Sequence, residues 1–169
     1  TLSVIFSICF CLNEFELPKS NITLQKAIQQ GRLNKQFNHV ISTLDPLYQS
    51  GSHSLEVLRL LLIAYSTIGK SDKQIAISLT LTEEYPELSI GYEALAFAYL
   101  EKQDEVNALH ILLQGLNKFP DEVMFPHTIA NIYYQAKNYS QAEKYFIIAL
   151  AVNPHMFSIM HTLAIMSED

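Results

Sequence analysis

Three prolines at a constant interval limit the fold of this chain more than any other feature of its sequence. Pro86, Pro120 and Pro154 lie 34 residues apart (120 − 86 and 154 − 120), and each follows a segment with apolar residues at helical spacing. Proline lacks an amide hydrogen and fits only the first turn of a helix, so each one is expected to separate two helices. This interval is typical of stacked helix pairs, because a single pair cannot bury both of its apolar faces.

The segments that end at these prolines also agree at other positions. With each proline counted as position 32, the units begin at Leu55, Ser89 and Val123. Positions 7, 8 and 11 lie on one face of the first helix of each unit. They hold Leu61, Leu95 and Ile129 at position 7, Leu62, Ala96 and Ala130 at position 8, and Tyr65, Tyr99 and Tyr133 at position 11. Small residues let two helices approach, and large residues fill the space that remains.

A break between two helices recurs within each unit. Residues 68–70, 102–104 and 136–138 occupy this turn, where glycine or asparagine can adopt the left-handed conformation that ends a helix. Polar residues near these turns can accept hydrogen bonds from the first amides of the second helices. The expected caps are Ser71 or Asp72, Asp104 and Ser140.

The first unit departs from the pattern in its second helix. Gln74 and Ser78 stand where a small and an aromatic residue are expected. We therefore expect this helix to be rotated, with Ala76 and Leu79 packing instead. In the third unit, Pro126 predicts a first helix that begins no earlier than about residue 122, because proline suits only the first turn.

The pattern resembles that of the tetratricopeptide repeat (TPR) family, and residues 126–154 match it best. The residues there that fall on pattern positions are Ile129, Ala130, Tyr133, Tyr139, Ala142, Phe146, Ala149 and Pro154. The resemblance implies an all-α fold, a right-handed superhelical array of antiparallel helix pairs (a TPR-like αα solenoid). Residues 55–88, 89–122 and 123–156 would each form one repeat.

The regions on either side continue the array less regularly. Residues 20–54 predict a degenerate TPR-like helical pair, with Gly31 at its turn and Pro46 kinking or ending its second helix. Residues 157–169 predict the first helix of a further repeat or a truncated cap. A polar cap would carry more charge than the apolar run 156–166 allows, which favours the further repeat.

Residues 1–19 form an apolar N-terminal segment. Its run Leu2–Leu12 is too short to cross a bilayer, which takes about 20 apolar residues, but has the size of a signal-peptide core. It is expected to be a signal-peptide remnant, a first helix or a truncated anchor. A signal peptide would make the protein periplasmic or secreted, and otherwise it would be cytoplasmic. Membrane contact is expected only if this segment is retained.

Charge and motifs argue against several functions. The chain has 17 acidic and 11 basic residues, a net charge of −6, so nucleic acid is not an expected partner. We find no glycine-rich phosphate loop, nucleophile elbow or His-Glu-x-x-His helix, and therefore predict no enzymatic activity, no catalytic residue and no cofactor. His127 and His161 lie 34 residues apart (161 − 127), but a metal site needs a further ligand, so no metal is expected.

The function is therefore expected to lie in a surface. In TPR proteins the first helices line the concave face, and the resemblance implies a groove at the corresponding positions here. The predicted partner-binding residues are Arg59, Ile63, Ser66, Glu93, Phe97, Leu100, His127, Asn131 and Tyr134. Family members that hold a C-terminal carboxylate use Lys, Arg and Asn clamps at such positions. Only Arg59 and Asn131 remain here, so a carboxylate clamp is not supported.

We predict a non-enzymatic scaffold that binds an extended peptide or an amphipathic helix of a protein partner in this groove. Aromatic and large apolar side chains dominate such interfaces. The expected anchors are Phe97, Leu100, Met124 and Tyr134, unless Phe97 and Tyr134 pack against adjacent helices. Two alternatives stay open. In the first, the chain is the docking or substrate-presenting part of a larger enzyme. In the second, it is a self-assembling module whose apolar run 156–166 contacts a second copy.

Overall fold

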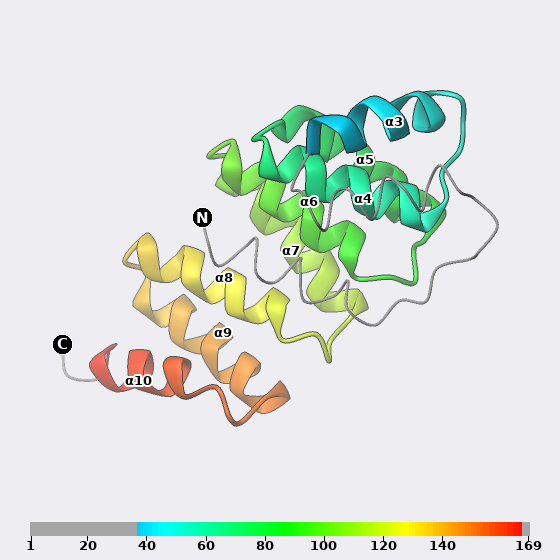
Figure 1. Ribbon diagram of the computed structural model, residues 1–169. Coiled ribbons are helices and arrows are strands. Elements are labelled where there is room, and N and C mark those ends of the chain that lie inside the picture. Colours follow the sequence, from blue (N-terminus) through cyan, green and yellow to red (C-terminus); the bar gives the residue numbers. More distant parts are fainter. Residues whose placement is uncertain (1–36, 167–169) are drawn as a thin grey trace. The chain divides into compact units, whose positions relative to one another are not determined.

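The structure, a computed structural model, describes residues 37–166. In this range the chain forms eight helices and no β-strand, so the predicted all-α fold is confirmed there (Figure 1). None of these helices is long and apolar enough to span a membrane. A right-handed superhelix stays a prediction. The expectations for residues 1–19, and for the first helix of the pair predicted over residues 20–54, lie outside the described residues.

The chain divides into two compact units, and the first ends at Pro86. Its described part contains α3 (Phe37–Gln49), α4 (Leu55–Thr67) and α5 (Ser71–Glu84). Helix α4 packs against both α3 and α5. Apolar side chains from all three helices are fully or almost fully buried: Val40, Leu44, Leu58, Leu61, Ile77 and Leu81.

The second unit begins at Glu87, and each of its helices packs against the next one in sequence. The helices are α6 (Ile90–Glu101), α7 (Glu105–Lys118), α8 (Met124–Gln135), α9 (Tyr139–Val152) and α10 (Phe157–Met166). Pro126 is the third residue of α8, within the first turn, where its missing amide hydrogen breaks no helical hydrogen bond.

The turns after α4, α6 and α8 share one geometry at the 34-residue interval. Gly69, Gln103 and Lys137 have φ angles of 68°, 60° and 59°, in the left-handed region. The amide of the following residue donates to a tyrosine carbonyl five residues back, at 2.9 Å in all three turns: Lys70 to Tyr65, Asp104 to Tyr99 and Asn138 to Tyr133. This is the Schellman motif, which satisfies the last carbonyls of a helix.

Side-chain caps begin two of the second helices. The side-chain oxygens of Asp104 and Asn138 accept hydrogen bonds from the amides of Asn107 and Gln141, at 3.1 and 3.3 Å. The predicted cap Asp104 is therefore confirmed, and α9 is capped by Asn138 instead of the predicted residue. The predicted caps that instead lie inside the first turns of their helices are Ser71, Asp72 and Ser140.

Two core clusters of the second unit are built from equivalent positions. Three buried members of the second cluster lie 34 residues after a buried member of the first. The first contains Ala96, Leu112 and Phe125, and the second contains Ala130, Phe146 and Ile159. Helix α10 therefore packs against the preceding pair through the same position that α8 uses, at Ile159 and Phe125 respectively.

Helix α5 is not rotated as its sequence suggested. Gln74 and Ser78 are 1% and 0% exposed, whereas Leu79 is 43% exposed and Ala76 also faces solvent. The expected repacking on Ala76 and Leu79 is therefore wrong. The hydroxyl of Ser78 donates to the carbonyl of Gln74 at 2.8 Å, so this buried polar group is satisfied within its own helix.

Pro46 was expected either to kink or to end the helix that contains it, and the second of these expectations is wrong. Helix α3 continues past Pro46 to Gln49, so the proline does not end it. Val40 and Leu44, which precede this proline in α3, are buried. Pro46 lacks the amide hydrogen that would be donated to the carbonyl of Ser42, four residues back, so one helical hydrogen bond is missing within α3.

Candidate partner-binding surface

The nine predicted groove residues form one stripe on each first helix. We name these the α4 stripe (Arg59, Ile63, Ser66), the α6 stripe (Glu93, Phe97, Leu100) and the α8 stripe (His127, Asn131, Tyr134). In each stripe the residues follow i, i+4, i+7 spacing, which places them along one side of the helix. All nine are partly buried, and none is fully buried or fully exposed.

The α6 and α8 stripes lie in one unit, and the α4 stripe lies in the other. Helices α6 and α8 share a core cluster, to which α6 contributes Ala96 and α8 contributes Phe125 and Ile129. The side chains of Ala96, Phe125 and Ile129 are fully buried. The α6 and α8 stripes lie beside this shared core cluster. Because the cluster contains side chains of both helices, it holds α6 and α8 in place relative to each other.

Glu93 is the charged residue of the α6 stripe. The hydroxyl of Ser89 donates a hydrogen bond of 2.7 Å to its Oε1 atom. Burial raises the pKa of Glu93 above the ordinary value for a glutamate; the Ser89 hydrogen bond opposes this rise, and the negative charge of Glu122 adds to it. No sequence pattern indicates this environment, because it depends on how deeply one side of α6 is buried.

The two apolar residues of the α6 stripe differ in their surroundings. Leu100 packs against the core cluster that contains Ala96, Ile129 and Ile132. Phe97 belongs to neither core cluster of the second unit and remains partly exposed. Of the two predicted aromatic anchors, Phe97 is therefore the one that packs on neither of these two clusters.

His127 and Asn131 form a polar pair on the α8 stripe. The amide nitrogen of Asn131 lies 3.2 Å from Nε2 of His127. An amide NH₂ group only donates, so this imidazole nitrogen accepts and must be unprotonated. Burial lowers the pKa of His127, which favours the same neutral form. The imidazole also lies 6.4 Å from the ring of Phe146, measured between ring centroids.

Tyr134 packs largely inside its own unit. Its ring centroid lies 5.7 Å from that of Tyr139 and 6.5 Å from that of Phe146. Phe146 is 2% exposed, so the side of Tyr134 that faces it supports the core. Substitution of Tyr134 would therefore change stability as well as any surface contact.

The residues between 37 and 166 offer no group of three or more histidine, cysteine, aspartate or glutamate side chains that could hold a metal ion. His127 is partly buried, while His161 is exposed on α10. Their shared repeat position does not make them alike, because His127 contacts the buried Phe146 and hydrogen-bonds to Asn131.

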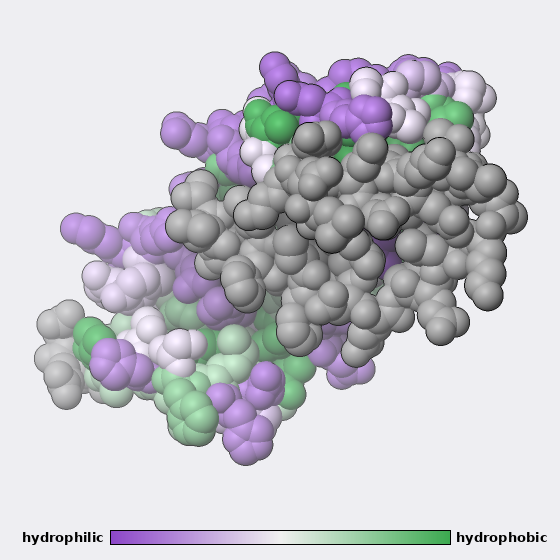
Figure 2. Space-filling model, viewed as in Figure 1, coloured by the Kyte–Doolittle hydropathy of each residue, from purple (hydrophilic) through white to green (hydrophobic). Residues whose placement is uncertain are grey.

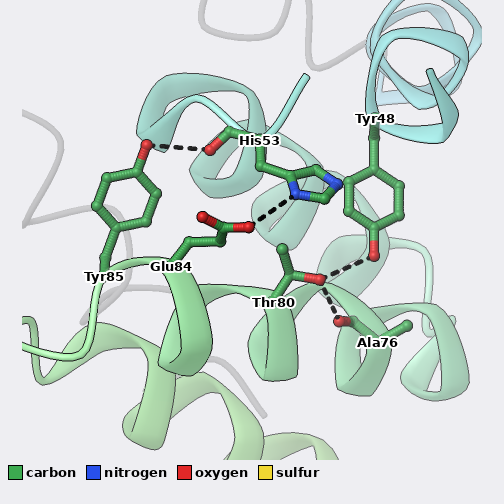
Figure 3. A network of polar contacts seen from close by, with 6 residues as sticks. All are labelled: Tyr48, His53, Ala76, Thr80, Glu84 and Tyr85. Atoms are coloured by element: carbon green, nitrogen blue, oxygen red, sulfur yellow. Dashed lines mark hydrogen bonds and ion pairs between the residues drawn. The ribbon is translucent and has the colours of Figure 1, made fainter. Parts of the chain in front are cut away.

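A polar network that no sequence pattern marked joins the end of α3 and the segment after it to α5 and Tyr85 (Figure 3). The hydroxyl groups of Tyr48 and Thr80 lie 3.0 Å apart, and the Tyr85 hydroxyl donates to the carbonyl of His53 at 3.0 Å. Nδ1 of His53 lies 3.3 Å from Oε1 of Glu84. These contacts link residues about one repeat apart, and no local sequence pattern marks them.

A second missed contact involves the first of the three aligned tyrosines. The Tyr65 hydroxyl donates to Oδ1 of Asp45 at 2.6 Å, and burial, this hydrogen bond and the charge of Asp45 raise the pKa of Tyr65. Tyr133, at the equivalent position, instead stacks on Tyr145 at 5.8 Å between ring centroids. The aligned tyrosines share a place in the turn but not the same side-chain partners.

Comparison with solved structures identifies chains of the same fold. A crystal structure of MamA matches with a TM-score of 0.74 and 13% sequence identity, covering 89% of this chain and 85% of that chain. A structure of MamA AMB-1 has a TM-score of 0.67 and 18% identity, with 86% and 79% coverage. One of MamA MSR-1 has a TM-score of 0.67 and 15% identity, with 90% and 88% coverage. At these identities the likeness shows a shared helical fold.

No protein-family model matches the sequence, and no curated protein is significantly similar to it. The solved structures therefore support the helical-repeat architecture without adding residues to the candidate surface. The case for a partner-binding surface therefore depends on the three stripes and on the residues that they contact.

Helix α10 carries a second exposed apolar area. Phe157, Met160 and Ile165 are 74%, 45% and 45% exposed, while Ile159 on the same helix is buried against α9. Figure 2 shows hydrophobic surface in green over α10, interrupted by more polar residues. No aspartate, glutamate, lysine or arginine occurs in α10, although the chain as a whole is acidic.

Proposed function

We propose that this protein is a non-enzymatic TPR-type scaffold that binds a segment of a protein partner along its first helices. The observation that carries the proposal is the partly exposed Phe97, which lies on the same side of α6 as Glu93 and belongs to neither core cluster. A large aromatic side chain in such a place is typical of an anchor in a protein interface.

The α8 stripe supports the proposal with a different chemistry. The contact between Asn131 and His127 uses Nδ2 of Asn131 and Nε2 of His127, and within residues 37–166 it leaves Oδ1 of Asn131 and Nδ1 of His127 available to a ligand. Such groups can orient a peptide backbone, which needs both donors and acceptors. Apolar anchoring and backbone orientation together are what an extended ligand requires.

The test is to replace Phe97 with alanine in the full chain and to pan wild-type and variant proteins with a random peptide library. We expect peptides enriched by the wild type to bind the variant at least about tenfold more weakly, the usual cost of removing an interface anchor. Ile147→Ala is the matched control, because Ile147 is 55% exposed on α9, outside the stripes. Equal binding by the Phe97→Ala variant would overturn the proposal.

A second candidate function is self-association through α10. The exposed Phe157, Met160 and Ile165 form an apolar surface on a helix without aspartate, glutamate, lysine or arginine, so two copies would meet there with little charge repulsion. Sedimentation should then show a dimer that Phe157→Asp dissociates and Ile147→Asp does not. A monomer at all concentrations, or a dimer equally sensitive to both substitutions, would exclude α10 as the contact.

A further inference from the structure

Glu93 is the acidic residue of the α6 stripe, and its side chain is partly buried. Its carboxyl group accepts the Ser89 hydrogen bond and makes no ion pair with a described Lys, Arg or His side chain. In the first unit, by contrast, the carboxyl groups of Glu84 and Asp45 form ion pairs with His53 and Lys73. A partly buried carboxylate without a counter-ion is costly, because burial removes water from the charge.

A second carboxylate reinforces this negative potential. Glu122 lies just before α8 and acts electrostatically on Glu93, although it comes from a different segment of the chain. Glu122 is exposed, so its charge is hydrated, whereas that of Glu93 is partly buried. A ligand cation placed at Glu93 would therefore interact favourably with both carboxylates.

Apolar contacts begin one helical turn further along α6. A rise of 1.5 Å per residue places Phe97 about 6 Å and Leu100 about 10 Å along the helix from Glu93. An extended peptide advances about 3.3 Å per residue, so these separations correspond to about two and three ligand residues. The α6 stripe thus combines a negative end and an apolar end at a spacing that a short peptide segment can match.

We propose that the α6 stripe selects peptide segments in which a lysine or arginine lies two or three residues from a large apolar residue. The cation binds at Glu93, and the apolar side chain packs on Phe97 and the exposed part of Leu100. This inference rests on the proposed function and adds the chemistry of the partner to it. An acidic segment is disfavoured, because it would bring like charges together at Glu93 and Glu122.

The composition of the peptides enriched by the full-length wild-type protein tests this selection. We expect lysine or arginine to be enriched two or three positions from an aromatic or aliphatic residue. For one such peptide, replacing the basic residue with glutamine should weaken binding about tenfold, and replacing it with glutamate should weaken it further.

Glu93→Gln separates the charge effect from the rest of the surface. Glutamine keeps the size and the acceptor for Ser89 but removes the charge, so the preference for the basic peptide over its glutamine analogue should disappear while the apolar preference remains. Glu143→Gln is the matched control, because Glu143 is an exposed glutamate of α9 and the net charge changes equally. The preference should be unchanged in that variant.

The outcomes also separate this inference from the proposed function. Peptides that depend on Phe97 but show no basic preference would overturn the inference and leave the proposed function standing. A basic preference that survives Glu93→Gln would overturn the assignment of the cation to Glu93. Failure to enrich any peptide that depends on Phe97 would overturn both.

Discussion

Gly115 illustrates how a single position is determined by its neighbour. A Cβ atom at this position would lie 2.2 Å from Cε1 of Phe125 and 2.6 Å from two other atoms of the same ring. The ring is fully buried in the first core cluster of the second unit, so it has little room to move. The equivalent position one repeat later is Ala149, in a cluster where the smaller Ile159 takes the place of Phe125.

We therefore predict that Gly115→Ala destabilises the protein. Overpacking of a filled core costs about 1–3 kcal/mol, which exceeds or offsets the gain of up to about 1 kcal/mol from the higher helix propensity of alanine. Chemical denaturation of the full chain would measure the change in the free energy of unfolding.

Phe125→Leu provides the control for this prediction. In that background the side chain opposite Gly115 is smaller, so Gly115→Ala should be neutral or stabilising. A stabilising effect of Gly115→Ala in the wild-type background would show that the Phe125 ring does not require the glycine.

At the scale of helices and turns, the interval between prolines was enough to locate most elements. It predicted where the first helices end, because the left-handed residues Gly69, Gln103 and Lys137 all fall within the expected turns. It did not predict which residue adopts the left-handed conformation when glycine is absent. Gln103 and Lys137 do so because the two helices that flank them are held together by the core, which outweighs the local cost.

The error in α5 has a related cause. The sequence pattern considers only residue types, and the polar Gln74 and Ser78 therefore led to the prediction of a rotated helix. In the structure both side chains are buried at the positions that the repeat geometry reserves for packing. The register set by the turn at Gly69 therefore outweighs the polarity of two residues.

For the candidate surface, the spacing of residues could be predicted but their environments could not. The i, i+4, i+7 pattern placed each stripe along one side of its helix. Whether a side chain such as Tyr134 faces a partner or packs on Phe146 depends on contacts across the unit. The raised pKa of Glu93 and the lowered pKa of His127 arise in the same way, from burial that only the folded unit creates.

For the whole molecule, the central claim is that a partner binds along the α6 and α8 stripes. Titration of the isotopically labelled full chain with an enriched basic and apolar peptide, followed by NMR chemical shifts of the backbone amides, tests it directly. We predict that the largest shifts occur within residues 93–100 and 127–134. Largest shifts on the second helices α7 and α9, with residues 93–100 and 127–134 unchanged, would contradict the account.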